Sequence, residues 1–134
     1  MTSTKAAVRP PITLAESEAD TLADLALAMQ GRQPEVSRLL LEEIDRARTV
    51  PADRVPRDVV TMGSTVVFAV RETGERRTIM LVYPGEADIS QGRLSILTPV
   101  GAGLLGLRVG QEISWPDRSG EDRLLAIESV DRPG

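Results

Sequence analysis

The sequence contains no cysteine and no histidine. The chain therefore has no disulfide, no thiol nucleophile, no Ser-His-Asp triad and no Cys/His zinc site. An enzyme built from it would depend on carboxylates, Lys5, arginines or hydroxyls. We expect no enzymatic activity, no metal and no cofactor. The composition fits a reducing cytoplasm, which is where we expect the protein to work.

Aromatic residues make up only 2% of the chain: Phe68, Tyr83 and Trp115. The core must therefore be aliphatic, and we expect the three aromatic side chains to lie in the core or on a sheet face. Long apolar runs are missing too, since none approaches the roughly 18 residues needed to cross a membrane. Residues 1–10 lack an apolar segment of the signal-peptide type, so we expect neither a signal peptide nor a membrane partner.

Acidic residues outnumber basic ones by 20 to 16, and the formal net charge is -4. A net acidic chain is a poor general binder of nucleic acid, so we expect no direct sequence-specific nucleic-acid partner. The length of 134 residues allows one modest domain with a small appendage.

The first half of the chain predicts a helical hairpin over residues 13–50, behind a disordered segment over residues 1–12. Thr13-Leu14-Ala15-Glu16 has the spacing of a capping box, and the helix that follows extends to about Met29. Pro34 begins a second helix that ends near Arg48. Apolar residues recur at helical spacing in both arms: Leu22, Leu25, Ala26 and Met29, then Val36, Leu39, Leu40, Ile44 and Ala47. Two such helices with a short connection form an antiparallel hairpin.

Four acidic residues crowd the first helix: Glu16, Glu18, Asp20 and Asp24. We interpret them as solvated acids that the helix dipole favours, since a metal or acid/base site needs carboxylates that converge on one point.

Residues 51–56 form a linker, because Pro51 and Pro56 prevent a helix from continuing. Residues 57–134 then alternate with the period of strands, and hairpin turns fall at 72–75 and 116–120. One short helix interrupts them, with Thr98 as its cap, Pro99 at its first position and Gly106 at its end. These patterns predict an α+β domain in which a twisted antiparallel sheet covers one short helix.

Residues 101–106 spell G-x-G-x-x-G, a pattern that holds a pyrophosphate when it joins a strand to a long helix. Here Pro99 interrupts the approach, and too little chain follows for further parallel strands. We interpret the stretch as an apolar helix packed on the sheet.

Several motifs resemble the C-terminal domain of the bacterial Gre transcript-cleavage factors: Met62-Gly63-Ser64-Thr65-Val66, Thr73-Gly74-Glu75, Glu86-Ala87-Asp88 and Thr98-Pro99-Val100-Gly101 with Leu104-Leu105-Gly106. Others resemble the Rnk proteins, named as regulators of nucleoside diphosphate kinase: Asp58-Val59-Val60-Thr61-Met62, Leu81-Val82-Tyr83-Pro84 and Trp115-Pro116. The resemblance covers about residues 13–130 and is strongest in the second half.

The resemblance implies an FKBP-like domain behind a short coiled-coil hairpin. It also implies binding to core RNA polymerase near the rim of the secondary channel. In Gre factors a longer hairpin carries acidic residues that help to hold a catalytic metal. Here the tip reads Gln30-Gly31-Arg32-Gln33-Pro34, with only Glu35 nearby, which is a poor magnesium site. We therefore expect a polymerase binder that competes with Gre-type factors and does not stimulate transcript cleavage.

By the same resemblance, the contact residues are Glu86, Asp88 and Pro99. The alternative for the two acids is a solvated loop without a partner. An FKBP-like fold also suggests prolyl isomerase activity, but three aromatic residues are too few to line such a pocket. A regulator that acts through another partner, such as nucleoside diphosphate kinase, stays open, because either function requires only an exposed protein-binding face.

Overall fold

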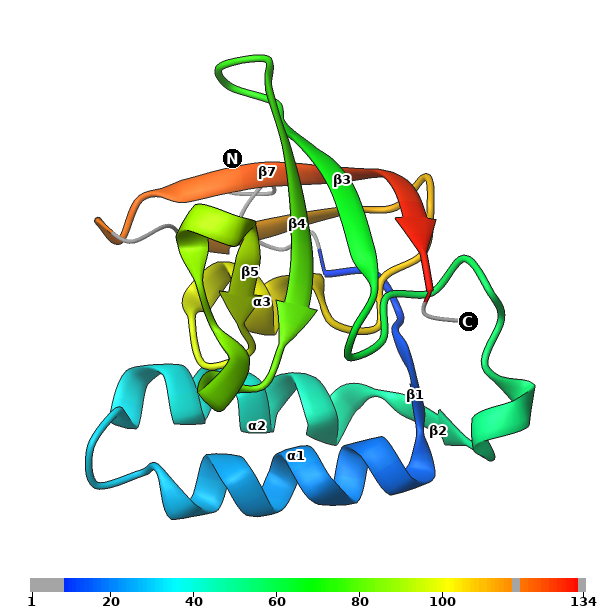
Figure 1. The fold of residues 1–134 in the computed structure, drawn as a ribbon, viewed down its shortest axis with the longest axis vertical. Coiled ribbons are helices and arrows are strands. Elements are labelled where there is room, and N and C mark those ends of the chain that lie inside the picture. Colours follow the sequence, from blue (N-terminus) through cyan, green and yellow to red (C-terminus); the bar gives the residue numbers. More distant parts are fainter. Residues whose placement is uncertain (1–8, 117–118, 133–134) are drawn as a thin grey trace, which may run out of the picture.

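The computed structural model describes residues 9–116 and 119–132, in which a helical hairpin lies along one side of a curled sheet (Figure 1). The hairpin consists of α1 (Glu16–Ala28) and α2 (Pro34–Arg46), and the short helix α3 (Pro99–Leu104) lies between α2 and the sheet. The strands are β1 (Thr13–Ala15), β2 (Arg48–Val50), β3 (Thr65–Val70), β4 (Glu75–Val82), β5 (Arg93–Ser95), β6 (Glu112–Pro116) and β7 (Asp122–Asp131). The 3-10 turns among the described residues are η2 (Ala52–Arg54), η3 (Pro84–Glu86) and η4 (Ile89–Gln91).

The predicted helical hairpin is confirmed, and its two apolar stripes face inward. Leu22 and Ala26 on α1 and Leu40 on α2 have no exposed surface. Burying a leucine side chain stabilises a fold by about 1.5–3 kcal/mol, so these stripes hold the arms in place. Pro34 occupies the first turn of α2, as its fixed φ predicts.

The predicted capping box at Thr13 is wrong. Residues Thr13–Ala15 form β1, which pairs in parallel with β2, and α1 begins only at Glu16. The backbone N–H of Thr13 donates to the carbonyl of Gly106 (3.2 Å), so Thr13 is held in an extended conformation. Tertiary hydrogen bonds therefore override a local capping signal.

The sheet has the strand order β5-β4-β3-β7-β6 and confirms the predicted α+β fold class. Its central and β6 pairings are antiparallel, as expected, whereas β5 runs parallel to β4. The segment between them contains η3 and η4, and these two turns carry the chain back so that Arg93 pairs with Met80. The turn expected at 116–120 lies partly outside the described residues.

The short helix α3 begins as the sequence predicts. The hydroxyl of Thr98 accepts a hydrogen bond from the N–H of Gly101 (3.1 Å), and Pro99 takes the first position. The glycines of this helix allow close packing. A Cβ on Gly101 would collide with the carbonyl oxygen of Ser95, and a Cβ on Gly103 would lie 2.7 Å from the indole of Trp115.

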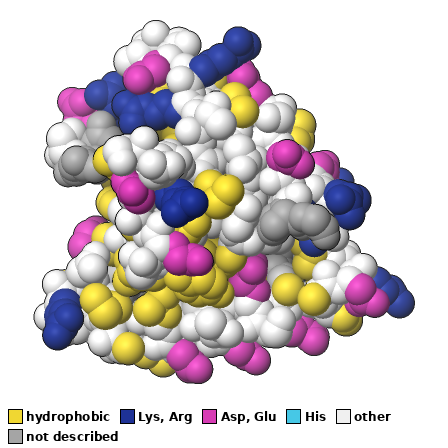
Figure 2. Space-filling view, viewed as in Figure 1, with side chains coloured by type: hydrophobic (Ala, Val, Ile, Leu, Met, Phe, Trp, Pro, Cys, Tyr) yellow, Lys and Arg dark blue, Asp and Glu magenta, His cyan; other side chains and the backbone are white. Residues whose placement is uncertain are grey.

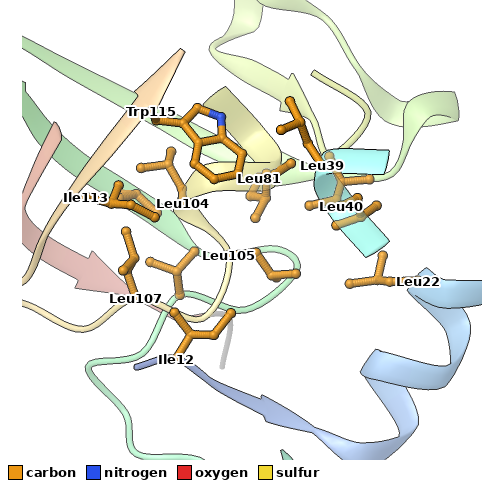
Figure 3. Packing of buried hydrophobic residues seen from close by; sticks show 14 of the residues in the cluster. Ile12, Leu22, Leu39, Leu40, Leu81, Leu104, Leu105, Leu107, Ile113 and Trp115 are labelled. Carbon is orange, nitrogen blue, oxygen red and sulfur yellow. The ribbon is translucent and has the colours of Figure 1, made fainter. Parts of the chain in front are cut away.

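One hydrophobic core joins the helical hairpin to the sheet. Figure 3 shows Leu22, Leu39 and Leu40 of the hairpin facing the side chains around Leu81 and Leu104. Much of the hairpin therefore packs against the rest of the chain. Within the described residues no helix combines the length and the hydropathy needed to span a membrane.

The expectation of disorder over residues 1–12 is wrong for residues 9–12. Ile12 is 1% exposed and belongs to the core, and its carbonyl accepts a hydrogen bond from the N–H of Arg48 (2.9 Å). Residues 1–8 lie outside the described residues. An apolar side chain directly after two prolines was the signal in the sequence that this segment packs.

Candidate protein-binding groove

A groove of about 520 Å³ lies between the sheet and the first turn of α3, and we call it the sheet–α3 groove. Residues from β3, β4, β5, β6, β7, α3 and η4 line it: Phe68, Val70, Thr73, Glu75, Arg77, Ile79, Ile89, Leu94, Thr98, Pro99, Val100, Trp115, Pro116, Ser119, Arg123 and Leu125. Most of these side chains are apolar. A concave apolar surface bounded by charge fits a segment of another protein.

Of the three contact residues expected from the sequence, only Pro99 lies in the groove. Asp88 does not line it, but the next residue, Ile89, does. Glu86 lies at the end of η3, earlier in the same loop, and its side chain is exposed. The structure therefore brings Pro99 together with the loop that carries the acids, and it places both acids outside the groove lining.

Ile89 is the groove residue that the sequence analysis missed. Its side chain is 71% exposed, the highest fraction among the exposed large hydrophobic residues of the described chain. The signal was a lone isoleucine in a polar loop, between Asp88 and Ser90. Ile89 is a candidate contact because it continues the apolar lining of the groove into solvent, where a partner can cover both together.

Trp115 forms part of the groove floor and holds the first turn of α3. Its indole N–H donates to the carbonyl oxygen of Pro99, and its ring packs against Gly103. The indole thus fixes the position of Pro99, which lines the groove.

Phe68 and Trp115 are buried, with exposed fractions of 3% and 1%, as their expected place in the core requires. Both also line the groove. Two aromatic residues among the sixteen that line it do not make a mainly aromatic pocket, so the expectation of no prolyl isomerase activity stays a prediction. Tyr83 is half-buried outside the groove, and burial raises the pKa of its hydroxyl.

Asp88 stabilises its own loop through hydrogen bonds. Its carboxylate accepts hydrogen bonds from the hydroxyl (2.6 Å) and the N–H (3.1 Å) of Ser90. Asp88 is thereby the N-terminal cap of η4. The hydrogen bond from the Ser90 hydroxyl lowers the pKa of this exposed carboxyl. Its backbone also pairs with that of Arg93. Replacing Asp88 therefore disturbs the loop as well as any contact with a partner.

Charges of both signs surround the groove. Arg77 pairs with Glu75 (3.3 Å), and Arg123 pairs with Glu121 (3.2 Å). Figure 2 shows acidic and basic side chains interspersed over the visible face, without a continuous region of one sign. Such mixed charge can orient a partner that carries charges of both signs.

The tip of the helical hairpin carries no concentration of acids. Residues 30–33 are exposed, and the nearest carboxylate, Glu35, is bound to Arg38 at 2.7 Å. Across residues 9–116 and 119–132, no group of three or more His, Cys, Asp or Glu side chains is placed to hold a metal ion.

Glu18 differs from the solvated acid that the sequence suggested. One oxygen of its carboxylate accepts a hydrogen bond from the N–H of Met62 (3.2 Å), and the other is buried without a partner among the described residues. Burial raises the pKa of Glu18 and outweighs the hydrogen bond from Met62. This side chain ties α1 to the loop before β3.

Comparison with known proteins agrees with this architecture. Residues 55–132 match the family described as transcription elongation factor GreA/GreB, C-terminal. The regulator of nucleoside diphosphate kinase from Escherichia coli is 39% identical over 107 residues, which is 80% of this chain and 79% of that protein. The transcription elongation factor GreA from Mesorhizobium japonicum is 34% identical over 113 residues, covering 78% of this chain and 72% of that protein.

A solved structure described as a prokaryotic transcription elongation factor GreA/GreB from Nitrosomonas europaea is also similar. It is 37% identical, superposes with a TM-score of 0.71, and covers 92% of this chain and 99% of its own. The protein thus belongs to the class in which a helical hairpin is joined to a Gre-type C-terminal domain. The chain belongs to the GreA/GreB family of transcription elongation factors, and its relatives include a regulator of nucleoside diphosphate kinase.

Proposed function

We propose that this protein binds core RNA polymerase at the rim of the secondary channel and competes there with Gre-type factors. Membership of the GreA/GreB family supports a polymerase partner. The observation that carries the proposal is the sheet–α3 groove, with Pro99 in its lining and exposed Ile89 at its edge. The proposal places the protein in the cytoplasm, where bacterial polymerase works.

The groove has the chemistry of a docking site for a folded segment. Its apolar floor gains from losing contact with water, and the paired charges beside it can orient an incoming segment. Ile89 would lose most of its exposed surface on docking. Glu86 lies on the same loop and is proposed to meet a basic side chain of the polymerase.

We propose that the bound protein does not stimulate transcript cleavage. Magnesium requires clustered oxygen ligands, and the one carboxylate near the tip is engaged by Arg38. Each arm of the hairpin has 13 residues, which corresponds to roughly 20 Å of helix. Much of that length packs on the core and is not free to project.

A second candidate function is regulation of nucleoside diphosphate kinase through direct contact. The observation that favours it is the 39% identity to the regulator of nucleoside diphosphate kinase from Escherichia coli. The same groove would then seat a different protein, so a binding measurement with each purified partner distinguishes the two.

The test measures binding of the full chain to purified core RNA polymerase, with Ile89→Ser as the groove variant. Val109→Ser is the matched control, because Val109 is also an exposed aliphatic residue (42%) but does not line the groove. We expect about tenfold weaker binding for Ile89→Ser, since burying an isoleucine is worth about 1.5–3 kcal/mol, and unchanged binding for Val109→Ser. Equal affinities for both variants would contradict the use of this groove. Binding to nucleoside diphosphate kinase alone would favour the second candidate.

A further inference from the structure

Arg9 contacts the helical hairpin and the groove floor at the same time. Its Nη1 lies 3.6 Å from Glu43 Oε2 and 3.7 Å from Glu42 Oε1, both on α2. Its guanidinium carbon also lies 5.1 Å from the centre of the Trp115 ring, within the range of a cation–π interaction. One side chain near the start of the described chain therefore connects α2 to β6.

The segment around Arg9 is held from several sides. Arg46 of α2 donates from Nη1 to the carbonyl of Pro10 (2.6 Å), and Gln111 donates to the carbonyl of Pro11 (3.2 Å). Ile12 follows in the core. These contacts fix the backbone next to Arg9, and this restricts where its side chain can lie.

Glu43 is the buried residue through which Arg9 contacts the helical hairpin. The residue is fully buried and is bound by Arg46 at 2.6 Å as well as by Arg9. A buried carboxylate needs its cations, because a buried charge without partners is strongly destabilising. The position of α2 and the position of Arg9 are therefore linked.

Trp115 is the residue through which Arg9 contacts the proposed docking surface. Its indole lies under Arg9, packs against Gly103 and donates to the carbonyl of Pro99. Trp115 and Pro99 both line the sheet–α3 groove. A change at Arg9 thus reaches the surface that we propose for docking.

We propose that Arg9 couples the helical hairpin to the sheet–α3 groove. When Arg9 contacts the Glu42 and Glu43 carboxylates and the Trp115 ring together, the groove floor is held in the conformation that docks. When these contacts are broken, the ring and the first turn of α3 are less constrained, and docking is weaker. Because coupling is reciprocal, a partner that fills the groove also tightens the hairpin against the sheet. This inference rests on the proposed use of the groove.

The first experiment tests the coupling without any partner. Trp115 is the only tryptophan in the sequence, so its emission and near-ultraviolet circular dichroism report on the groove floor directly. The variants are Glu43→Gln, Arg9→Met and the double variant, each as the full chain. We expect Glu43→Gln to change the Trp115 signal when Arg9 is present and to cause no further change once Arg9 is methionine. The same change in both backgrounds would overturn the coupling.

Two further variants keep this test decisive. If Glu43→Gln does not fold, the exposed partner Glu42→Gln replaces it in the same cycle, because Glu42 also pairs with Arg9. Arg76→Met is the matched control, since it removes an ion pair between β4 and β7 (Arg76 to Glu128, 2.8 Å) without contact to Arg9. The control should leave the Trp115 signal unchanged, and an equal change there would also overturn the proposal.

The second experiment measures affinity for core RNA polymerase. Removing a partly exposed cation–π contact should weaken docking about two- to fivefold in Arg9→Met, with Arg9→Lys in between. Unchanged affinity in Arg9→Met, beside a wild type that binds, would overturn the coupling. A wild type that does not bind contradicts the proposed function, while the Trp115 cycle still decides the coupling.

Discussion

The carboxylate of Glu18 on α1 accepts a hydrogen bond from the N–H of Met62, 44 residues further along the chain (3.2 Å). The other carboxylate oxygen is buried without a partner among the described residues. Glu18 therefore connects the helical hairpin to the loop before β3, but in its charged form it does so at a cost in solvation.

The first prediction concerns the pH dependence that follows from this contact. Burial raises the pKa of Glu18 in the folded state above its usual value of 4.5, so the folded protein binds this proton more tightly than the unfolded chain. Protonation stabilises the fold below about pH 4.5, and this contribution is lost as the pH rises through the folded pKa. Glu18→Gln keeps an acceptor for Met62 and carries no charge.

We therefore expect a higher Tm for Glu18→Gln than for the wild type at pH 7, with a difference that vanishes as the pH falls toward 4. Thermal unfolding over that pH range measures it. Glu16→Gln, on the exposed side of the same turn, is the control and should follow the wild type. A Glu18→Gln variant that is less stable at pH 7 would show that the charged carboxylate is the favoured form.

The second prediction concerns the contact between α3 and the indole. Gly103→Ala places a Cβ where the Trp115 ring stands, 2.7 Å away, and should lower the free energy of unfolding by about 1–3 kcal/mol. Urea denaturation followed by Trp115 emission measures the loss. Gly85→Ala is the control, since a Cβ there meets nothing within 4 Å, and it should leave stability within about 0.5 kcal/mol.

The third prediction separates the two acids of the loop over residues 84–92. Glu86→Lys should weaken polymerase binding and leave stability unchanged, because the Glu86 side chain is exposed. Asp88→Lys should lower loop stability as well, by about 0.5–2 kcal/mol, because it removes the cap of η4. Asp88→Asn, which retains an acceptor for Ser90, should restore the stability. Binding that tolerates Glu86→Lys would remove this acid from the interface.

The fourth prediction concerns the hydrogen bond from Trp115 to Pro99. Trp115→Phe removes the indole N–H and part of the buried volume, so it should lower the free energy of unfolding by about 2 kcal/mol. It should also weaken polymerase binding, since Pro99 loses its support. Tyr83→Phe, a half-buried aromatic outside the groove, is the control and should bind as the wild type does. Loss of stability with full binding would show that Pro99 does not need this support.

The elements that the sequence predicted best are those with local signals. Pro34 at the start of α2 and Thr98 with Pro99 at the start of α3 appear where their backbone chemistry requires. Thr13 failed because its extended backbone is held by Gly106 and β2, partners that are distant in the sequence. The parallel pairing of β5 was hidden for the same reason, since two short 3-10 turns leave no periodic pattern.

The groove was only partly predictable. Pro99 was found through the resemblance, whereas Ile89 and Trp115 reach the groove through strand order and loop path, which no single segment encodes. Glu18 looked like a solvated helix acid because its partner, Met62, lies in a different part of the chain. Charge patterns identify where acids gather, but only the packed fold shows which of them is buried.

The most direct test of the account is competition for core RNA polymerase between this protein and a Gre-type factor, with transcript cleavage measured in the same reaction. Increasing amounts of the protein should displace the Gre-type factor and suppress the cleavage that it stimulates. Ile89→Ser should do so about tenfold less well. Simultaneous binding of both proteins, or cleavage stimulated by this protein alone, would contradict the account.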